Sequence, residues 1–96
     1  MPKYIVLANW TAQGVKNVKD SAARWDAAKE AARALGATFE TIYMVMGDYD
    51  LVAILDAPND EVVAKLLLHN ASGGDFHTKT LKAFDESDYR RIIGSL

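Results

Sequence analysis

The fold is decided by the stretch Ile42-Tyr43-Met44-Val45-Met46-Gly47-Asp48-Tyr49-Asp50-Leu51-Val52-Ala53-Ile54-Leu55. Its two apolar halves are rich in β-branched and aromatic residues, which are enriched in strands. Gly47-Asp48-Tyr49 has the chemistry of a turn, because glycine adopts positive φ freely and aspartate accepts backbone hydrogen bonds. We therefore expect a strand over residues 37–46, a hairpin turn, and a strand over residues 50–56.

A helix is expected before this hairpin. Its apolar side chains recur at spacings of three and four, which places them on one helix face: Trp25, Ala28, Ala32 and Leu35. Asp20 or Ser21 offers a side-chain oxygen to cap the first turn, and Gly36 is placed to end the helix.

A second helix is expected after the hairpin. Pro58 suits its first turn, because the fixed φ of proline matches a helix and its missing N–H is not needed there. An apolar stripe follows at helical spacing: Val62, Val63, Leu66, Leu67 and Leu68. The polar and glycine-containing residues 70–74 are expected to end this helix.

The outer segments predict two further strands. The run from Tyr4 to Trp10 is aromatic and β-branched, as in a strand. Residues 11–19 form a cationic connection, in which Thr11 is placed to cap one helical turn. Residues 76–84 alternate weakly, as in an edge strand. Asp85 is placed to cap a last short helix, whose apolar residues are Tyr89, Ile92 and Ile93.

The order strand, helix, strand, strand, helix, strand is that of ferredoxin-like split βαβ domains. We expect a single α+β domain over residues 1–96, with a four-stranded antiparallel sheet. Right-handed crossovers would place both long helices on one face of that sheet and put the first and third strands at its centre.

The opposite face of the sheet is expected to be apolar as well. Both alternating sets of side chains in the two central strands are mainly apolar: Tyr4, Val6, Ala8 and Trp10 against Ile5, Leu7 and Asn9, and Leu51, Ala53 and Leu55 against Val52, Ile54 and Asp56. The face presents a footprint of roughly 400 Å², large enough to mark an interaction surface. We predict that two sheets close face to face in a homodimeric α+β barrel. The alternative is that the C-terminal helix covers this face within one chain.

Composition excludes several classes of protein. The 96 residues include no cysteine, which leaves no disulfide framework or thiolate metal site and fits a cytoplasmic protein. No stretch has the roughly 18 apolar residues of a membrane span. The net charge of −2 disfavours nucleic acid, and Leu51–Leu55 offers no aromatic base-stacking platform.

The segment Gly47-Asp48-Tyr49-Asp50-Leu51 resembles the small GYD-domain proteins of bacteria. The resemblance covers nearly the whole chain and extends to these segments: Tyr4-Ile5-Val6-Leu7, Gln13-Gly14 with Lys16, Lys19, Asp20 and Ser21, Asp56-Ala57-Pro58, and Thr78-Lys79-Thr80-Leu81-Lys82-Ala83-Phe84. It implies a dimeric α+β barrel and supplies no established activity. The hairpin and the Thr-x-Thr strand also resemble the effector-binding domain of feast/famine transcription regulators, which implies a small-molecule site at a subunit interface near the hairpin. The chain has no room for the DNA-binding half of those regulators.

Three groups of residues are candidates for ligand binding. Tyr49 and Asp50 place a phenol beside a carboxylate at the expected barrel mouth, where they could orient a polar ligand. Lys16, Lys19 and Arg24 surround the start of the first long helix, whose free N–H groups favour an anion. Trp10 and Tyr43 could line an apolar pocket. Each group also has a plain structural explanation as a turn, a solvated surface or packing.

The expected function is a homodimeric binding module for a small, possibly anionic, molecule at the barrel or dimer interface. No metal is expected, because His69 and His77 lack a third ligand at a recognisable spacing. The sequence identifies no cofactor. One alternative is a small enzyme, since the architecture resembles that of small monooxygenases and haem-degrading proteins. Another is a purely structural subunit of a larger ring or complex, which would make the protein a higher oligomer.

Overall fold

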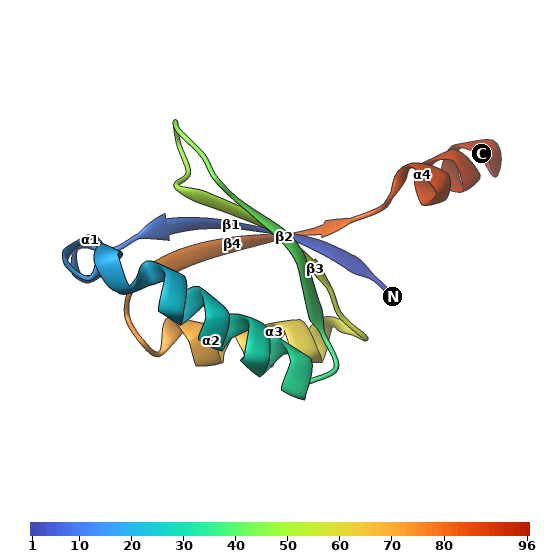
Figure 1. Cartoon of the computed structure of the whole chain (residues 1–96). Coiled ribbons are helices and arrows are strands. Elements are labelled where there is room, and N and C mark those ends of the chain that lie inside the picture. The colour runs from blue at the N-terminus through green and yellow to red at the C-terminus, as the bar shows by residue number, and fades with distance from the viewer.

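The computed structural model describes all residues from Met1 to Leu96. Figure 1 shows one sheet with two long helices beneath it and a last helix standing apart. The elements follow in this order: β1 (Lys3–Trp10), α1 (Ala12–Lys16), the 3-10 helix η1 (Val18–Asp20), α2 (Ser21–Ala34), β2 (Thr38–Met44), β3 (Leu51–Asp56), α3 (Asp60–Ala71), β4 (Phe76–Ala83) and α4 (Glu86–Gly94).

The four strands form one antiparallel sheet in the order β2-β3-β1-β4. The two central strands are β1 and β3, where Tyr4 pairs with Leu55 and Val6 with Ala53. The predicted α+β ferredoxin-like fold is therefore confirmed. An irregularity in the β2–β3 register between Phe39 and Thr41 adds one residue to the edge strand. Such a bulge bends and twists a strand locally.

The hydrophobic core lies between the sheet and the two long helices. In β1 the residues Tyr4, Val6 and Ala8 are buried, whereas their neighbours are only partly covered. This period of two shows that one face of the strand is packed under helices. The core cluster contains seven residues: Tyr4, Ala32, Ala37, Leu55, Ala57, Val63 and Leu66.

Three predicted helix ends are confirmed. The Thr11 side chain accepts from the Gly14 N–H, and the Asp85 side chain accepts from the Asp88 N–H, as N-caps do. Gly36 follows α2 with a φ of 80°, the left-handed conformation that glycine adopts most easily.

Other predicted boundaries are wrong. Pro58 does not open α3, because Asn59 is its N-cap and accepts from the Val62 N–H at 3.0 Å. Asp20 makes no side-chain capping bond, since η1 runs directly into α2. The helix α3 continues through Ala71, into the segment expected to end it. The strands β2 and β3 are shorter than expected, because residues 45–50 all belong to the hairpin connection.

The second face of the sheet is covered by nothing in the chain. The helix α4 follows β4 and extends away from the sheet, so the expectation that it could cover this face within one chain is wrong (Figure 1). None of its residues is buried. The uncovered face, called the open face below, carries these apolar side chains: Ile5, Leu7, Tyr43, Val52, Ile54 and Leu81. No helix in the structure is long and apolar enough to cross a membrane.

Candidate functional site

A cavity of about 310 Å³ lies between the sheet and the helices α2 and α3. It is called the helix–sheet cavity below. Its apolar walls come from both layers: Val6, Ala8 and Ala53 from the central strands, Phe39 and Ile42 from β2, Trp25, Ala27 and Ala28 from α2, and Leu67 from α3. Small side chains from both layers line this space: Ala8 and Ala53 from the sheet, and Ala27 and Ala28 from α2. None of the four fills it.

The cavity is partly open to solvent, since Arg24, Ala27 and Gly73 on its wall are exposed. Its volume reaches the lower end of the range for ligand pockets, about 300–1,000 Å³. The helix–sheet cavity is therefore a space in this chain that is suited to hold another molecule.

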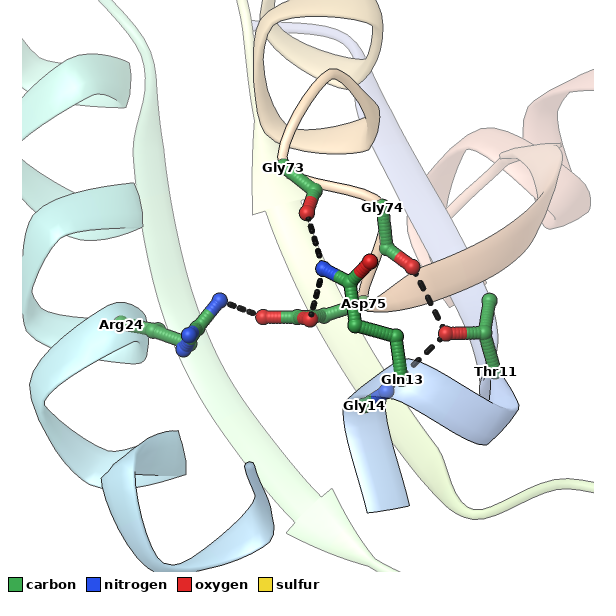
Figure 2. Close-up of polar contacts among 7 residues, drawn as sticks. All are labelled: Thr11, Gln13, Gly14, Arg24, Gly73, Gly74 and Asp75. Atoms are coloured by element: carbon green, nitrogen blue, oxygen red, sulfur yellow. Dashed lines mark hydrogen bonds and ion pairs between the residues drawn. The ribbon is translucent and has the colours of Figure 1, made fainter. Parts of the chain in front are cut away.

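A polar junction forms one end of the cavity (Figure 2). The Asp75 side chain is buried, although it is a carboxylate: the residue is only 3% exposed. It forms an ion pair with Arg24 from α2 and accepts from Gln13 Nε2 at 3.0 Å. Gln13 Nε2 also donates to the carbonyl oxygen of Gly73 at 2.8 Å. The buried charge is thus paired and hydrogen-bonded, as burial requires.

The same junction joins α1 to the loop between α3 and β4. The Thr11 N–H donates to the Asp75 carbonyl oxygen at 2.9 Å, and the Thr11 hydroxyl donates to the Gly74 carbonyl oxygen at 2.6 Å. A Cβ atom on Gly14 would lie 2.1 Å from the Asp75 carbonyl oxygen. Only glycine allows this close approach of the two backbones.

Trp25 forms the aromatic wall of the cavity. The centroid of its ring lies 4.7 Å from the centroid of the Phe39 ring, and the two ring planes are inclined at 55°. Tilted aromatic pairs of this kind are favourable. The indole N–H of Trp25 is buried and has no hydrogen-bond acceptor within the chain. Such a group is unusual, because leaving a buried donor unpaired costs about 1–3 kcal/mol.

The predicted hairpin residues have structural partners. Asp50 Oδ2 accepts from the Trp10 backbone N–H at 3.0 Å, and the Asp50 N–H donates to Asn9 Oδ1 at 3.1 Å. The carboxylate thereby ties the end of the hairpin to the end of β1. Lys79 Nζ lies 5.9 Å from the centre of the Tyr49 ring. Gly47 has a φ of 118°, as its predicted place in the turn requires.

The other predicted site residues do not gather at one place. Arg24 is the one predicted residue that lines the cavity, and its guanidinium is already paired with Asp75. Lys16 and Lys19 are exposed and form no ion pair. Tyr43 lies on the open face and is 59% exposed. The three cations therefore do not share one ligand site, because Asp75 holds the third.

The sequence did not predict most of the residues that form the cavity. Asp75 and Gln13 were not singled out as site residues, and neither were the alanines that create the space. One available signal was the abundance of alanine in α2, which leaves room where two layers should meet. The other was the Gly73-Gly74-Asp75 sequence after a helix, where backbone approaches closely and a lone carboxylate follows.

A second polar cluster lies at the opposite end of the helix layer. The Tyr4 hydroxyl donates to the Asp60 carboxylate, and Lys82 Nζ lies 3.2 Å from the same carboxylate. The hydrogen bond to Asp60, with burial as a second cause, raises the pKa of Tyr4 to about 12. The same bond, followed by the one from Lys82, lowers the pKa of Asp60. This cluster fixes β1 to the start of α3.

The topology and the single covered sheet face define an α+β protein of the ferredoxin-like class. The family model described as the GYD domain matches residues 4–93. The chain therefore belongs to the GYD domain family. It is 35% identical over 89 residues to the "Glutamine synthetase and cystathionine beta-lyase binding protein" of Thermus thermophilus, covering 92% of this chain and 94% of that relative.

Two solved structures are similar in fold. TTHA0845 from Thermus thermophilus has a TM-score of 0.55 and 26% sequence identity, and the match covers 88% of this chain and 95% of that one. MtbAldR has a TM-score of 0.68 at 10% identity, which supports the fold alone. The match covers 88% of this chain but 52% of MtbAldR, so the chain spans about half the length of that protein.

Proposed function

We propose that this protein is a binding module that works as a homodimer, with the open faces of two sheets packed together. One observation carries the proposal: the two central strands present Ile5, Leu7, Val52 and Ile54 on a face that no part of the chain covers. An exposed apolar patch of this extent marks an interaction surface. A second copy of the same face supplies a matching surface for a two-fold dimer.

The border of the open face supports this proposal. Lys3 Nζ lies 2.9 Å from a Glu40 oxygen and 3.1 Å from an Asp56 oxygen, so charged groups at the edge are paired with one another. An apolar centre with a polar border is the usual anatomy of a protein interface. The proposal includes a cytoplasmic location, which a chain without cysteine fits.

Sedimentation equilibrium tests the dimer. We expect a mass twice the 10.5 kDa of one chain at micromolar concentration. Ile54→Lys should weaken dimerisation by at least about 100-fold, or roughly 3 kcal/mol, because it buries an unpaired charge. Leu68→Lys is the matched control, since Leu68 lies on α3 and is 72% exposed. A monomeric wild-type protein, or a dimer equally sensitive to both changes, would overturn the proposal.

A second function is favoured by one comparison. The relative that is 35% identical is named as a binding protein for glutamine synthetase and cystathionine beta-lyase. We propose that the partners of this chain also include enzymes. Sedimentation velocity of the purified chain mixed with the glutamine synthetase of its own source organism should show co-migration. If the two proteins sediment separately over micromolar concentrations, enzyme binding is wrong and the dimer is unaffected.

The alternative of a small cofactor-dependent enzyme makes a different prediction. A protein that retains haem or flavin is coloured, because such a group absorbs visible light, whereas a binding module without one is colourless. An absorption spectrum of freshly purified protein therefore separates the two. Binding is the better-supported proposal, because the polar groups at the cavity end are already paired with one another.

A further inference from the structure

We propose that the helix–sheet cavity binds a compact, uncharged, apolar molecule. The inference deepens the proposed binding function, and it does not depend on the dimer. The cavity lies under the helices, whereas the dimer would form on the opposite face of the sheet. The two sites can therefore be tested separately.

The shape of the core supports a ligand rather than a packing defect. The seven-residue core cluster fills one part of the space between the layers and includes Tyr4, Leu55 and Leu66. The cavity occupies another part, where Ala8 and Ala53 line it. Larger side chains, among them Trp25 and Phe39, line it as well, so the open volume is a bounded space beside the core cluster.

The polar groups at the cavity end argue against a charged ligand. Arg24 and Asp75 neutralise each other, and Gln13 donates a hydrogen bond to one oxygen of the carboxylate. A ligand carboxylate would have to displace Asp75 from Arg24 and leave that carboxylate buried without its partner, which is costly. A ligand cation would meet the same obstacle at Arg24. A neutral molecule leaves the ion pair intact.

The walls of the cavity favour an apolar ligand. Phe39, Ile42 and Leu67 suit an aromatic or aliphatic body. The indole N–H of Trp25 offers the ligand no hydrogen bond, because its nitrogen has almost no accessible surface.

The cavity has an entrance at the end of α3. His69, Ser72 and Gly73 line it and are exposed to solvent. These residues belong to the last turn of α3 and the loop that follows, so a ligand can enter without separation of the two layers. The junction of Gln13, Arg24 and Asp75 holds this loop in place beside the entrance (Figure 2).

Three probes of similar size test the ligand class: ethylbenzene and acetophenone are neutral, and benzoate is charged. The readout is the indole N–H cross-peak of Trp25 in nitrogen-labelled protein, assigned with Trp10→Phe, and the melting temperature. We expect ethylbenzene and acetophenone to shift the Trp25 cross-peak and raise the melting temperature, and to bind at least about tenfold more tightly than benzoate, because a charge buried without a partner is costly. Equal responses to the three, or none, would overturn the proposal.

A filled cavity tests the location. Ala53→Leu should weaken acetophenone binding at least about tenfold, because the added side chain takes the space of the ligand. Ala28→Leu provides a second variant from the helix layer in case the first does not fold. Ala64→Leu is the matched control, because Ala64 is exposed on α3 and does not line the cavity. Unchanged binding in a folded cavity variant would overturn the site. Sedimentation of the same samples reports the dimer independently, so failure of this inference is distinct from failure of the proposed function.

Discussion

Replacement of Gly14 by alanine sets two physical expectations against each other. Gly14 lies inside α1, and its φ is not positive, so helix propensity alone predicts that alanine stabilises the protein by about 1 kcal/mol. The structure predicts the opposite. The new Cβ would lie 2.1 Å from the Asp75 carbonyl oxygen and 3.2 Å from Trp10 Cδ1. The two backbones must then separate by about 1 Å before ordinary contact is restored.

The expected cost follows from the bonds that cross this contact. Separation would stretch the bond from the Thr11 N–H to the Asp75 carbonyl and the bond from Gln13 to the Asp75 carboxylate, worth about 1 kcal/mol each. Strain from overpacking adds about 1–3 kcal/mol. After the gain in helix propensity, the net loss is about 2–4 kcal/mol. For a chain of 96 residues this corresponds to a fall of roughly 8–30 °C in melting temperature.

Urea denaturation followed by tryptophan fluorescence, at one fixed protein concentration, measures this loss. Gly94→Ala is the control, because no atom lies within 4 Å of the Cβ position at Gly94 and its φ is not positive. That change should be neutral or stabilise by up to about 1 kcal/mol. If Gly14→Ala is as stable as the wild-type protein, the close contact with Asp75 does not exist and the reasoning is wrong.

Three further predictions concern other parts of the chain. The pKa of Tyr4 is raised from 10.0 to about 12, so its hydrogen bond to Asp60 contributes fully to the stability of the fold below pH 10 and is lost as pH rises to 12. The urea concentration at the unfolding midpoint should therefore fall less between pH 10 and pH 12 in Tyr4→Phe than in the wild-type protein. Asp50→Ala should cost about 1–3 kcal/mol and speed amide exchange at Trp10, whose N–H loses its acceptor, whereas unchanged exchange would contradict that bond. Ala53→Leu should stabilise the free protein by about 0.5–2 kcal/mol in thermal melts, because it fills the cavity; a loss of stability would show that the space is smaller than described.

The fold was largely predictable because its signals are local and repeated. The hairpin at Gly47, the periodic apolar faces of the two long helices and the cap residue Asp85 each act within a few residues. The residue at which α3 starts was not predictable in this way. Pro58 and Asn59 both carry helix-start signals, and it is the side chain of Asn59 that forms the capping hydrogen bond. Choosing between adjacent signals requires the backbone geometry.

The cavity was less accessible to sequence reasoning. It depends on Ala8 and Ala53 of the sheet and Ala28 of α2 lining the same space, although they belong to different elements. A pattern of apolar residues predicts that a face is buried, but it does not state whether the facing side chains fill the volume. The pairing of Arg24 with Asp75 joins residues far apart in sequence, so Arg24 was instead interpreted together with its neighbours Lys16 and Lys19.

The open face can be examined most directly with mixed samples of isotope-labelled and unlabelled protein. Isotope-filtered nuclear Overhauser spectra of such a sample detect only contacts between two different chains. We expect intermolecular contacts to the methyl groups of Ile5, Leu7, Val52 and Ile54, and none to the exposed methyl groups of Leu68 on α3. Contacts confined to the helix layer, or none at a concentration where the protein sediments as a dimer, would show that the uncovered sheet is not the surface that joins two copies.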